Sequence, residues 1–391
     1  MKLAADFSPS TITAGLVTVL VGFASSAVIV LQAAATLGAD AAQTGSWLWA
    51  LGLGMAVTSI GLSLRWREPV VTAWSTPGAA LLIGTGGGVG LAEATGAFIV
   101  AAALTALIGF SGAFEQLVRR IPVSIAAGML AGVLLRFGLE AFGALTAPSG
   151  LVAIMALAWL AGRRWAPRYA ILIVLVAGLG AAIAQGGLDT AAIGWQWATP
   201  VWTPPRFTLA ATVGVAIPLL FVTMASQNMP GAAVIRANGY ATPVSPALGW
   251  IGVVNLALAP FGAFALNLAA ITAALCAGPG AHPDPGRRYT AAIAAGAFYG
   301  LVGLGGATIA ALFAAMPREL IVGLAGIALL ATIGASLAQA MASESDREPA
   351  LVAFLVTGSG LTVAGVGSGF WGLVAGSLTL AALRPTYNRR P

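Results

Sequence analysis

The sequence predicts an all-α membrane protein that crosses the bilayer many times. Of its 391 residues, 59% are hydrophobic and only 8% are charged, and the mean hydropathy is +0.94. Soluble domains carry about a quarter charged residues, so a soluble fold of this composition would lack the polar side chains that cover a wet surface. The apolar residues also lie in long runs, and a helix needs roughly 20 of them to cross a bilayer.

The apolar runs, read between charged residues and Gly or Pro breaks, predict about fourteen membrane segments. In the first half of the chain they are 11–36, 43–64, 69–84, 90–110, 121–143, 148–162 and 168–186. In the second half they are 208–230, 245–261, 262–277, 289–313, 318–341, 349–366 and 368–384. The first run is too long for a cleaved signal peptide and is expected to stay as a membrane helix.

The arginines predict the orientation of these segments. With the N-terminus inside, the outside loops hold only Arg206 and Arg318. The inside loops and tail hold Arg65, Arg67, Arg119, Arg120, Arg163, Arg164, Arg168, Arg236, Arg287, Arg288, Arg347, Arg384, Arg389 and Arg390. This asymmetry follows the positive-inside rule, so both termini are expected in the cytoplasm and the chain in a bacterial-type inner (plasma) membrane. The net charge of +6 reflects these scattered arginines and does not indicate nucleic-acid binding.

The stretch 187–207 divides the chain almost in half and is expected to be an external connector. Its Trp195, Trp197 and Trp202 suit the lipid interface, where indole rings are enriched. Each half then holds about seven spans, and an odd number of spans inverts the second half relative to the first. The two short segments support such a repeat, because TAWSTPGAALL (72–82) and GAFALNLAAIT (262–272) align without gaps, with Trp74 opposite Phe264.

Pro77 and Gly78 interrupt the first of these short segments, which predicts a short extended piece followed by a half-helix. Extended backbone at membrane depth is tolerated only where protein buries it or where it lines a cavity. A half-helix that begins there presents free N–H groups and the positive end of its dipole, and two such ends could bind an anion. Interrupted segments at matching positions of two repeats indicate a transporter binding site. The alternative is a continuous helix with a proline kink.

Several polar side chains are candidates for ligand contact. Gln227 and Asn228 lie at the end of an apolar run. Two adjacent amides at membrane depth are energetically unfavourable unless they bond a ligand or clamp another helix. Asn267 is expected at the start of the second half-helix, as an N-cap, a ligand contact or both. Ser25 and Ser26 lie within the first segment and either face the ligand or bond their own helix.

Charged side chains within the predicted segments are few. Arg136 and Glu140 are four residues apart on one helix face, so they form either a neutralising pair or a proton-linked gate in which protonation releases Glu140. Glu93, near the outer end of its segment, is a third candidate, with simple exposure to water as the alternative. The lone His282 is expected in a solvated loop, and the single Cys276 excludes an intrachain disulfide. The sequence contains no metal-ligand cluster, catalytic triad or phosphate loop, so no enzyme, cofactor or metal is expected.

Three motifs carry a resemblance to a known family. They are SWLWALGLGMAVTSIGLSLRWREPVVTAWSTPGAALL (46–82), AGVLLRFGLEAFG (131–143) and ASQNMPGAAVIRANGY (225–240). In these motifs, and over nearly its whole length, the chain resembles the benzoate/proton symporter family, BenE. That family looks related to the nucleobase permeases and to the sulfate-transporter-like anion carriers.

The resemblance implies fourteen spans in two inverted seven-span repeats. Spans 1–4 (residues 1–110) and 8–11 (208–314) would form a core. Spans 5–7 (111–186) and 12–14 (315–391, with the C-terminal tail) would form a gate, and relatives commonly dimerise through the gate side. The substrate would lie between broken spans 3 and 10 and face span 8.

This placement gives each candidate residue a role. The half-helix that starts at Pro77 and Gly78 would direct N–H groups at the substrate carboxylate, with Ser75, Thr76 and Asn267 as further donors. Gln227 and Asn228 would orient the carboxylate, and Trp74 and Phe264 would flank the aromatic ring.

One departure from the related permeases bears on the substrate. Nucleobase permeases carry a glutamate on span 8 where this chain has Gln227, and a second glutamate on span 10 has no carboxylate counterpart near Asn267. Such acids would repel a carboxylate, so their absence suits benzoate. The expected function is proton-coupled import of benzoate or a similar aromatic carboxylate. The alternatives are a carrier of another organic anion or a nucleobase, and an anion channel.

Overall fold

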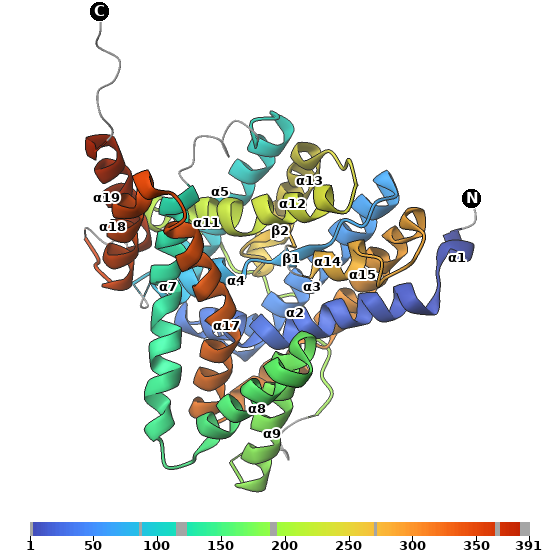
Figure 1. Ribbon diagram of the computed structural model, residues 1–391, viewed down its shortest axis with the longest axis horizontal. Coiled ribbons are helices and arrows are strands. Elements are labelled where there is room, and N and C mark those ends of the chain that lie inside the picture. Colours follow the sequence, from blue (N-terminus) through green and yellow to red (C-terminus); the bar gives the residue numbers. More distant parts are fainter. Residues whose placement is uncertain are drawn as a thin grey trace, which may run out of the picture.

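The computed structural model describes residues 3–85, 88–114, 123–187, 194–269, 272–363 and 368–383 (Figure 1). Helices dominate this part of the chain, and its strands are β1 (Thr72–Trp74) and β2 (Leu266–Leu268). The helices of the first half are α1 (Leu3–Asp6), α2 (Pro9–Thr36), α3 (Ala41–Trp66), α4 (Thr76–Ile83), α5 (Leu91–Phe110), α7 (Val123–Gly143), α8 (Leu151–Trp165) and α9 (Ala170–Ala184).

The second half begins with a continuous helical stretch that contains two wider, π-helical turns. Its parts are α10 (Leu209–Ala211), the π-turn Thr212–Ala216, α11 (Ile217–Thr223), the π-turn Met224–Asn228 and α12 (Met229–Ala237). The remaining helices are α13 (Val244–Leu258), α14 (Ala273–Ala277), α15 (Tyr289–Leu304), α16 (Gly306–Ala314), α17 (Arg318–Ala340), α18 (Arg347–Gly358) and α19 (Ser368–Leu383). Every segment predicted from the apolar runs contains one of these helices or a strand followed by a helix.

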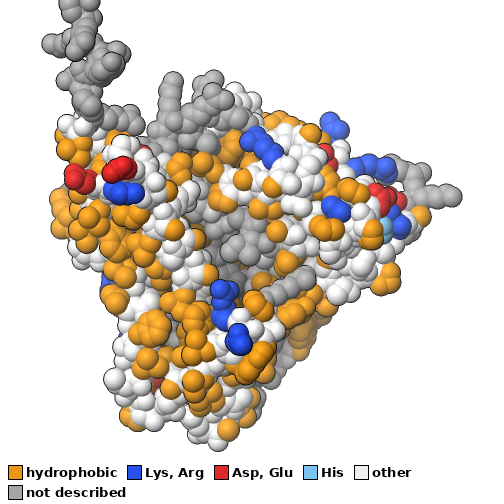
Figure 2. All heavy atoms as spheres, viewed as in Figure 1, with side chains coloured by type: hydrophobic (Ala, Val, Ile, Leu, Met, Phe, Trp, Pro, Cys, Tyr) orange, Lys and Arg blue, Asp and Glu red, His pale blue; other side chains and the backbone are white. Residues whose placement is uncertain are grey.

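Helix length and composition establish a multi-pass membrane protein. Among the described residues, six helices are long and apolar enough to cross a membrane, and two bent helix pairs raise that number to as many as eight. Apolar side chains also dominate much of the surface visible in Figure 2, while charged side chains gather in a few small groups. The predicted connector runs without regular structure from residue 194 to 208, and its Trp195, Trp197 and Trp202 are exposed.

The helices pack in two sets. In the first set, α3 lies along α15 and α5 lies along α13. In the second set, α7 packs against both α17 and α18. In Figure 1 the second set, with α19, occupies the left side, and α3 and α15 lie to the right of the strands. Small residues permit this packing, as is common between membrane helices: a Cβ atom on Gly52 would lie 2.6 Å from Cα of Gly303. The proposed core and gate division stays a prediction.

The two strands meet antiparallel near the middle of the molecule (Figure 1). Their register pairs Thr72 with Leu268, Ala73 with Asn267 and Trp74 with Leu266. Polar side chains hydrogen-bond backbone N–H groups at the outer edges of this small sheet. Ser59 Oγ accepts from Thr72 N–H at 3.0 Å, and Asn228 Oδ1 accepts from Leu268 N–H at 2.9 Å. Such pairing is what extended backbone needs inside a membrane.

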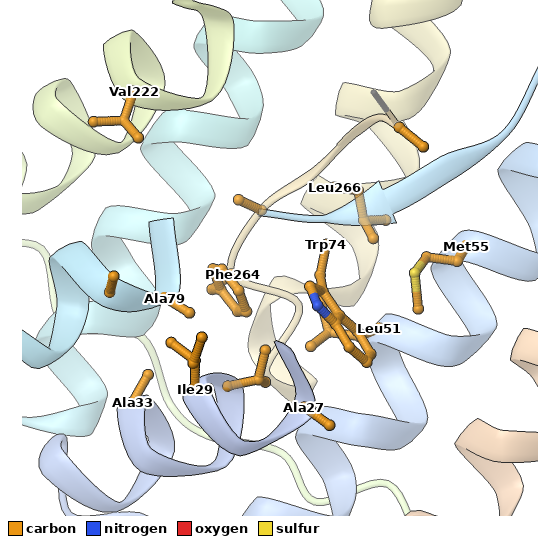
Figure 3. Close-up of a cluster of buried hydrophobic side chains, with 14 of the residues drawn as sticks. Ala27, Ile29, Ala33, Leu51, Met55, Trp74, Ala79, Val222, Phe264 and Leu266 are labelled. Atoms are coloured by element: carbon orange, nitrogen blue, oxygen red, sulfur yellow. The ribbon is translucent and has the colours of Figure 1, made fainter. Parts of the chain in front are cut away.

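The observed register corrects the gap-free alignment of the two short segments. Asn267 lies in the middle of β2, and not at the start of a half-helix, because α14 begins only at Ala273. A 3₁₀ turn and Gly262, whose φ is +107°, precede β2, so the second segment needs more residues than the first to reach its strand. Phe264 therefore has no position equivalent to that of Trp74. It packs among buried side chains (Figure 3), with its ring centroid 5.7 Å from that of Trp47.

Candidate binding site

A cavity of about 320 Å³ lies beside the two strands. Its walls come from α2, α3, β1, α4, the π-turn Met224–Asn228, α14 and α15 on one side, and from α9 and α17 on the other. The polar side chains on the walls are Ser26, Thr76, Gln227, Thr272, Tyr299 and Thr332. None of the described residues that line the cavity is charged. The volume is near the lower end of the range of about 300–1,000 Å³ found for ligand pockets, which suits a small molecule.

The N-terminal end of α4 opens on this cavity, which Thr76 and Pro77 line. Ser75 is the N-cap, and its buried Oγ accepts hydrogen bonds from Gly78 N–H at 3.0 Å and from the Thr223 hydroxyl at 3.2 Å. The N–H of Ala79 bonds the Ser75 carbonyl, and Pro77 has no N–H. In the described part of the chain only the Thr76 N–H of this first turn lacks a partner. The cap thus takes the Gly78 N–H that was expected to face the substrate, and Ser75 does not line the cavity. The helix end offers its dipole and the N–H and hydroxyl of Thr76.

The neighbouring amides Gln227 and Asn228 have different environments. Both belong to the π-turn Met224–Asn228, and π-turns are frequent at functional sites. Asn228 is fully buried, where its Oδ1 accepts from Leu268 N–H and its Nδ2 lies 3.4 Å from Met224 Sδ. Gln227 lines the cavity, and its amide bonds no described residue. The clamp interpretation therefore fits Asn228, and Gln227 is the amide that can reach a ligand.

Trp74 forms an aromatic part of the cavity wall. Its Nε1–H donates to Ser26 Oγ at 2.8 Å, and Ser26 donates in turn to the Gly22 carbonyl at 2.9 Å. The Phe23 ring meets the indole edge-on at a centroid distance of 5.3 Å. Ser26 thus holds Trp74 in place. The side chain of Ser25 lies outside the part of the molecule that the structure describes.

Asn267 is close to the cavity but does not line it. Its side chain is fully buried, and neither amide atom has a hydrogen-bonding partner among the described residues. Because directly paired residues of antiparallel strands point to the same face, Asn267 shares a face with Ala73, which lines the cavity. Phe264 does not line it either.

The charged candidates lie away from this cavity. Arg136 and Glu140 are both exposed on α7, and no hydrogen bond or ion pair joins any two charged side chains at this place in the described structure. The described structure therefore does not contain the neutralising pair, and the proton-linked gate stays a prediction. Arg136 lines a separate hollow of about 20 Å³ near the C-terminal end of α4. Glu93 is partly exposed in the first turn of α5.

Sequence reasoning missed a large part of the cavity wall. Tyr299 on α15, Ile171 on α9, and Ala328, Leu329, Ala331 and Thr332 on α17 all line the cavity. These side chains lie within long apolar runs that contain no break or charge. The only signals available from sequence were the hydroxyl groups of Tyr299 and of Thr332 in the run ATIGAS, and similar hydroxyls occur in many of the segments.

Solved structures show which fold the chain shares. The chain superposes on the transmembrane domain of a cyanobacterial bicarbonate transporter, BicA, with a TM-score of 0.61 and 15% identity, covering 96% of each chain. It superposes on SLC26A9 with a TM-score of 0.59 and 15% identity, covering 94% of this chain and 65% of that one. The chain therefore shares the polytopic helical membrane fold of these two proteins.

Sequence comparison gives the family. The family model of the benzoate membrane transport protein, BenE, matches residues 5–382. The chain is 50% identical to the inner membrane protein YdcO of Escherichia coli (strain K12), over 96% of both chains. It is 40% identical to a benzoate membrane transport protein of Acinetobacter baylyi, over 95% of both. The protein therefore belongs to the benzoate membrane transport protein family, which confirms the resemblance carried by its motifs.

Proposed function

We propose that this protein is a secondary active transporter that imports benzoate or a similar aromatic carboxylate together with a proton, by alternating access. The observation that carries the proposal is an uncharged cavity onto which the N-terminal end of α4 opens. A helix N-terminus attracts a carboxylate, Thr76 and Gln227 can donate hydrogen bonds to it, and the apolar walls with Trp74 suit an aromatic ring. The name of the family and of the Acinetobacter relative agrees with this substrate.

Proton symport follows from the energy of moving an anion inward. A cell interior at −100 mV opposes each negative charge by about 2.3 kcal/mol, and the sequence has no phosphate loop through which ATP could drive the step. A proton that travels with the carboxylate removes this electrical cost. Glu140, with Arg136 one helical turn away, is our first candidate for the proton-linked gate, and Glu93 is the second.

We propose a fourteen-span architecture of two inverted repeats, with both termini in the cytoplasm. Helix contacts support the repeat, because they are reciprocal: α3 on α15 joins the second span to the eleventh, and α5 on α13 joins the fourth to the ninth. In a seven-span repeat, span 2 corresponds to span 9 and span 4 to span 11, so the contact between spans 2 and 11 is equivalent to the contact between spans 9 and 4. The gate helices α7–α9 and α17–α19 would move against the core and provide a dimer interface, and the description of the E. coli relative supports the inner membrane.

Uptake by the purified protein in proteoliposomes tests this function. We expect labelled benzoate to accumulate when an inward proton gradient is imposed, and to stop accumulating when a protonophore collapses it. An excess of unlabelled aromatic carboxylate should compete, whereas a nucleobase should not. Competition by a nucleobase alone would favour the carrier of nucleobases, and large benzoate currents without a proton gradient would favour an anion channel.

A further inference from the structure

The side of the cavity formed by α9 and α17 contributes one polar side chain. From this side the lining residues are Pro167, Ile171, Leu172, Ala328, Leu329, Ala331 and Thr332. All except Thr332 are apolar, and all belong to the segments that we assign to the gate. The core side provides the helix end of α4 and the amide of Gln227. Thr332 is therefore the only described side chain on the gate side that could hydrogen-bond a ligand in this cavity.

The hydroxyl of Thr332 is not used by its own helix. Helical Ser and Thr side chains usually bond a carbonyl three or four residues earlier. Thr58, Thr105 and Thr379 do so here, with distances of 2.6–2.9 Å to the carbonyls of Gly54, Ala101 and Ala375. Thr332 makes no hydrogen bond to any residue that the structure describes, although its side chain is partly buried at the cavity wall. The hydroxyl oxygen is not sealed from solvent, so it is open to the cavity, where a bound carboxylate would take the place of water as its partner.

We infer that the hydroxyl of Thr332 is a direct hydrogen-bonding partner of the transported carboxylate, supplied by the gate to a site that the core otherwise builds. The inference rests on the proposed function, since it needs a substrate in this cavity. Its chemistry requires only that the Thr332 hydroxyl donate a hydrogen bond to a carboxylate oxygen. The remaining neighbours on α17 favour the same geometry, because the small side chains of Ala328 and Ala331 leave room for a ligand against the helix.

A ligand that bonds Thr332 as well as α4 would be held from both sides of the cavity. The complete set of hydrogen bonds then exists only while α17 lies against the core as it does here, with α2 as its core neighbour. Removal of the hydroxyl should weaken binding without slowing the movement that follows, since a contact present in the bound state and lost during transport adds affinity and not speed. A merely structural role would instead lower the yield of folded protein or the maximal rate.

The test compares Thr332→Val, which keeps the shape and removes the hydroxyl, with Thr332→Ser, which keeps the hydroxyl. The matched control is Thr379→Val on α19, whose hydroxyl bonds the Ala375 carbonyl and does not line the cavity. Benzoate Kd is measured by isothermal titration calorimetry in detergent, and KM and maximal rate are measured in proteoliposomes. A lost hydrogen bond of ordinary strength should raise Kd and KM of Thr332→Val about 3- to 10-fold without lowering the maximal rate. Thr332→Ser should stay near the parent, as should Thr379→Val.

The outcomes separate this inference from the proposed function. If the parent binds benzoate and Thr332→Val binds it equally well, the inference is wrong and the proposed function stands. If Thr332→Val and Thr332→Ser lose affinity equally, the methyl group matters and the hydroxyl contact is refuted. If the parent binds and transports no aromatic carboxylate, the proposed function itself fails. A loss of maximal rate at constant Kd would assign Thr332 to the moving parts and overturn its role as a ligand contact.

Discussion

The indole Nε1–H of Trp74 donates a 2.8 Å hydrogen bond to the hydroxyl oxygen of Ser26. This bond joins the last residue of β1 to the middle of α2, and both residues line the cavity. Trp74 directly precedes Ser75, the N-cap of α4. The position of the aromatic wall and that of the helix end therefore depend on one hydroxyl group from another helix.

Ser26→Ala should loosen this wall. It leaves a buried indole N–H without its acceptor, which costs about 1–3 kcal/mol. We expect a lower melting temperature in detergent and weaker benzoate binding, both measured on the same purified samples. Ser226→Ala is the matched control, because in the described part of the chain the Ser226 hydroxyl bonds only the Val222 carbonyl of its own helix. Parent-like values for Ser26→Ala would mean that packing alone holds Trp74.

Ser75→Ala should destabilise the start of α4. The side chain caps Gly78 N–H and also accepts from Thr223, and loss of an N-cap costs about 0.5–2 kcal/mol. We expect a lower melting temperature and a higher benzoate Kd. Thr223→Val, which removes only the second of the two donors, should have a smaller effect on both quantities. Equal effects of the two variants would contradict the capping role.

The membrane topology can be tested with two exposed positions. In a variant with Cys276→Ser, single cysteines are introduced by Gly187→Cys and Ser345→Cys, both at exposed sites in loops. We expect an impermeant maleimide to label position 187 from outside and position 345 only after the membrane is opened. Labelling of both positions from the same side would rule out the fourteen-span arrangement.

The sequence allowed most of the fold to be predicted, for a physical reason. A bilayer excludes charge and unpaired backbone, so long apolar runs locate the helices, and Pro77 with Gly78 locates the break before α4. The predicted alignment of the second broken segment with the first was wrong. Ala-rich stretches align in several registers, and the turn at Gly262 adds residues before β2. The lining residues on α17 could not be predicted, since an apolar run does not reveal which of its faces meets a cavity.

Glu140→Gln tests the proposed proton-linked gate. Glu140 is exposed and makes no hydrogen bond within the described structure, so we expect the variant to fold like the parent, with an unchanged melting temperature. If Glu140 carries the proton, benzoate uptake should lose its dependence on the proton gradient, while benzoate binding remains. Glu93→Gln serves as the comparison. Unchanged gradient dependence in both variants would move the proton site to another residue.

The last prediction concerns Gln227, whose amide lines the cavity and bonds no residue that the structure describes. Gln227→Glu introduces a negative charge beside the expected carboxylate. At an effective dielectric constant of about 20, two unit charges about 5 Å apart repel by roughly 3 kcal/mol, on the order of a hundredfold in affinity. Benzoate binding should therefore be lost at neutral pH and return partly in acid, where the new carboxyl group is protonated and the repulsion disappears.

Gln227→Ala separates charge from hydrogen bonding. It removes one hydrogen bond without adding repulsion, so its loss of affinity should be smaller, about 10-fold or less, and it should not depend on pH as the loss in Gln227→Glu does. The measurement is equilibrium binding of labelled benzoate to the parent and both variants across a pH series. If Gln227→Glu binds as tightly as the parent at alkaline pH, the carboxylate does not lie near the π-turn Met224–Asn228. The anion site would then have to lie elsewhere along the cavity, away from α4 and Gln227.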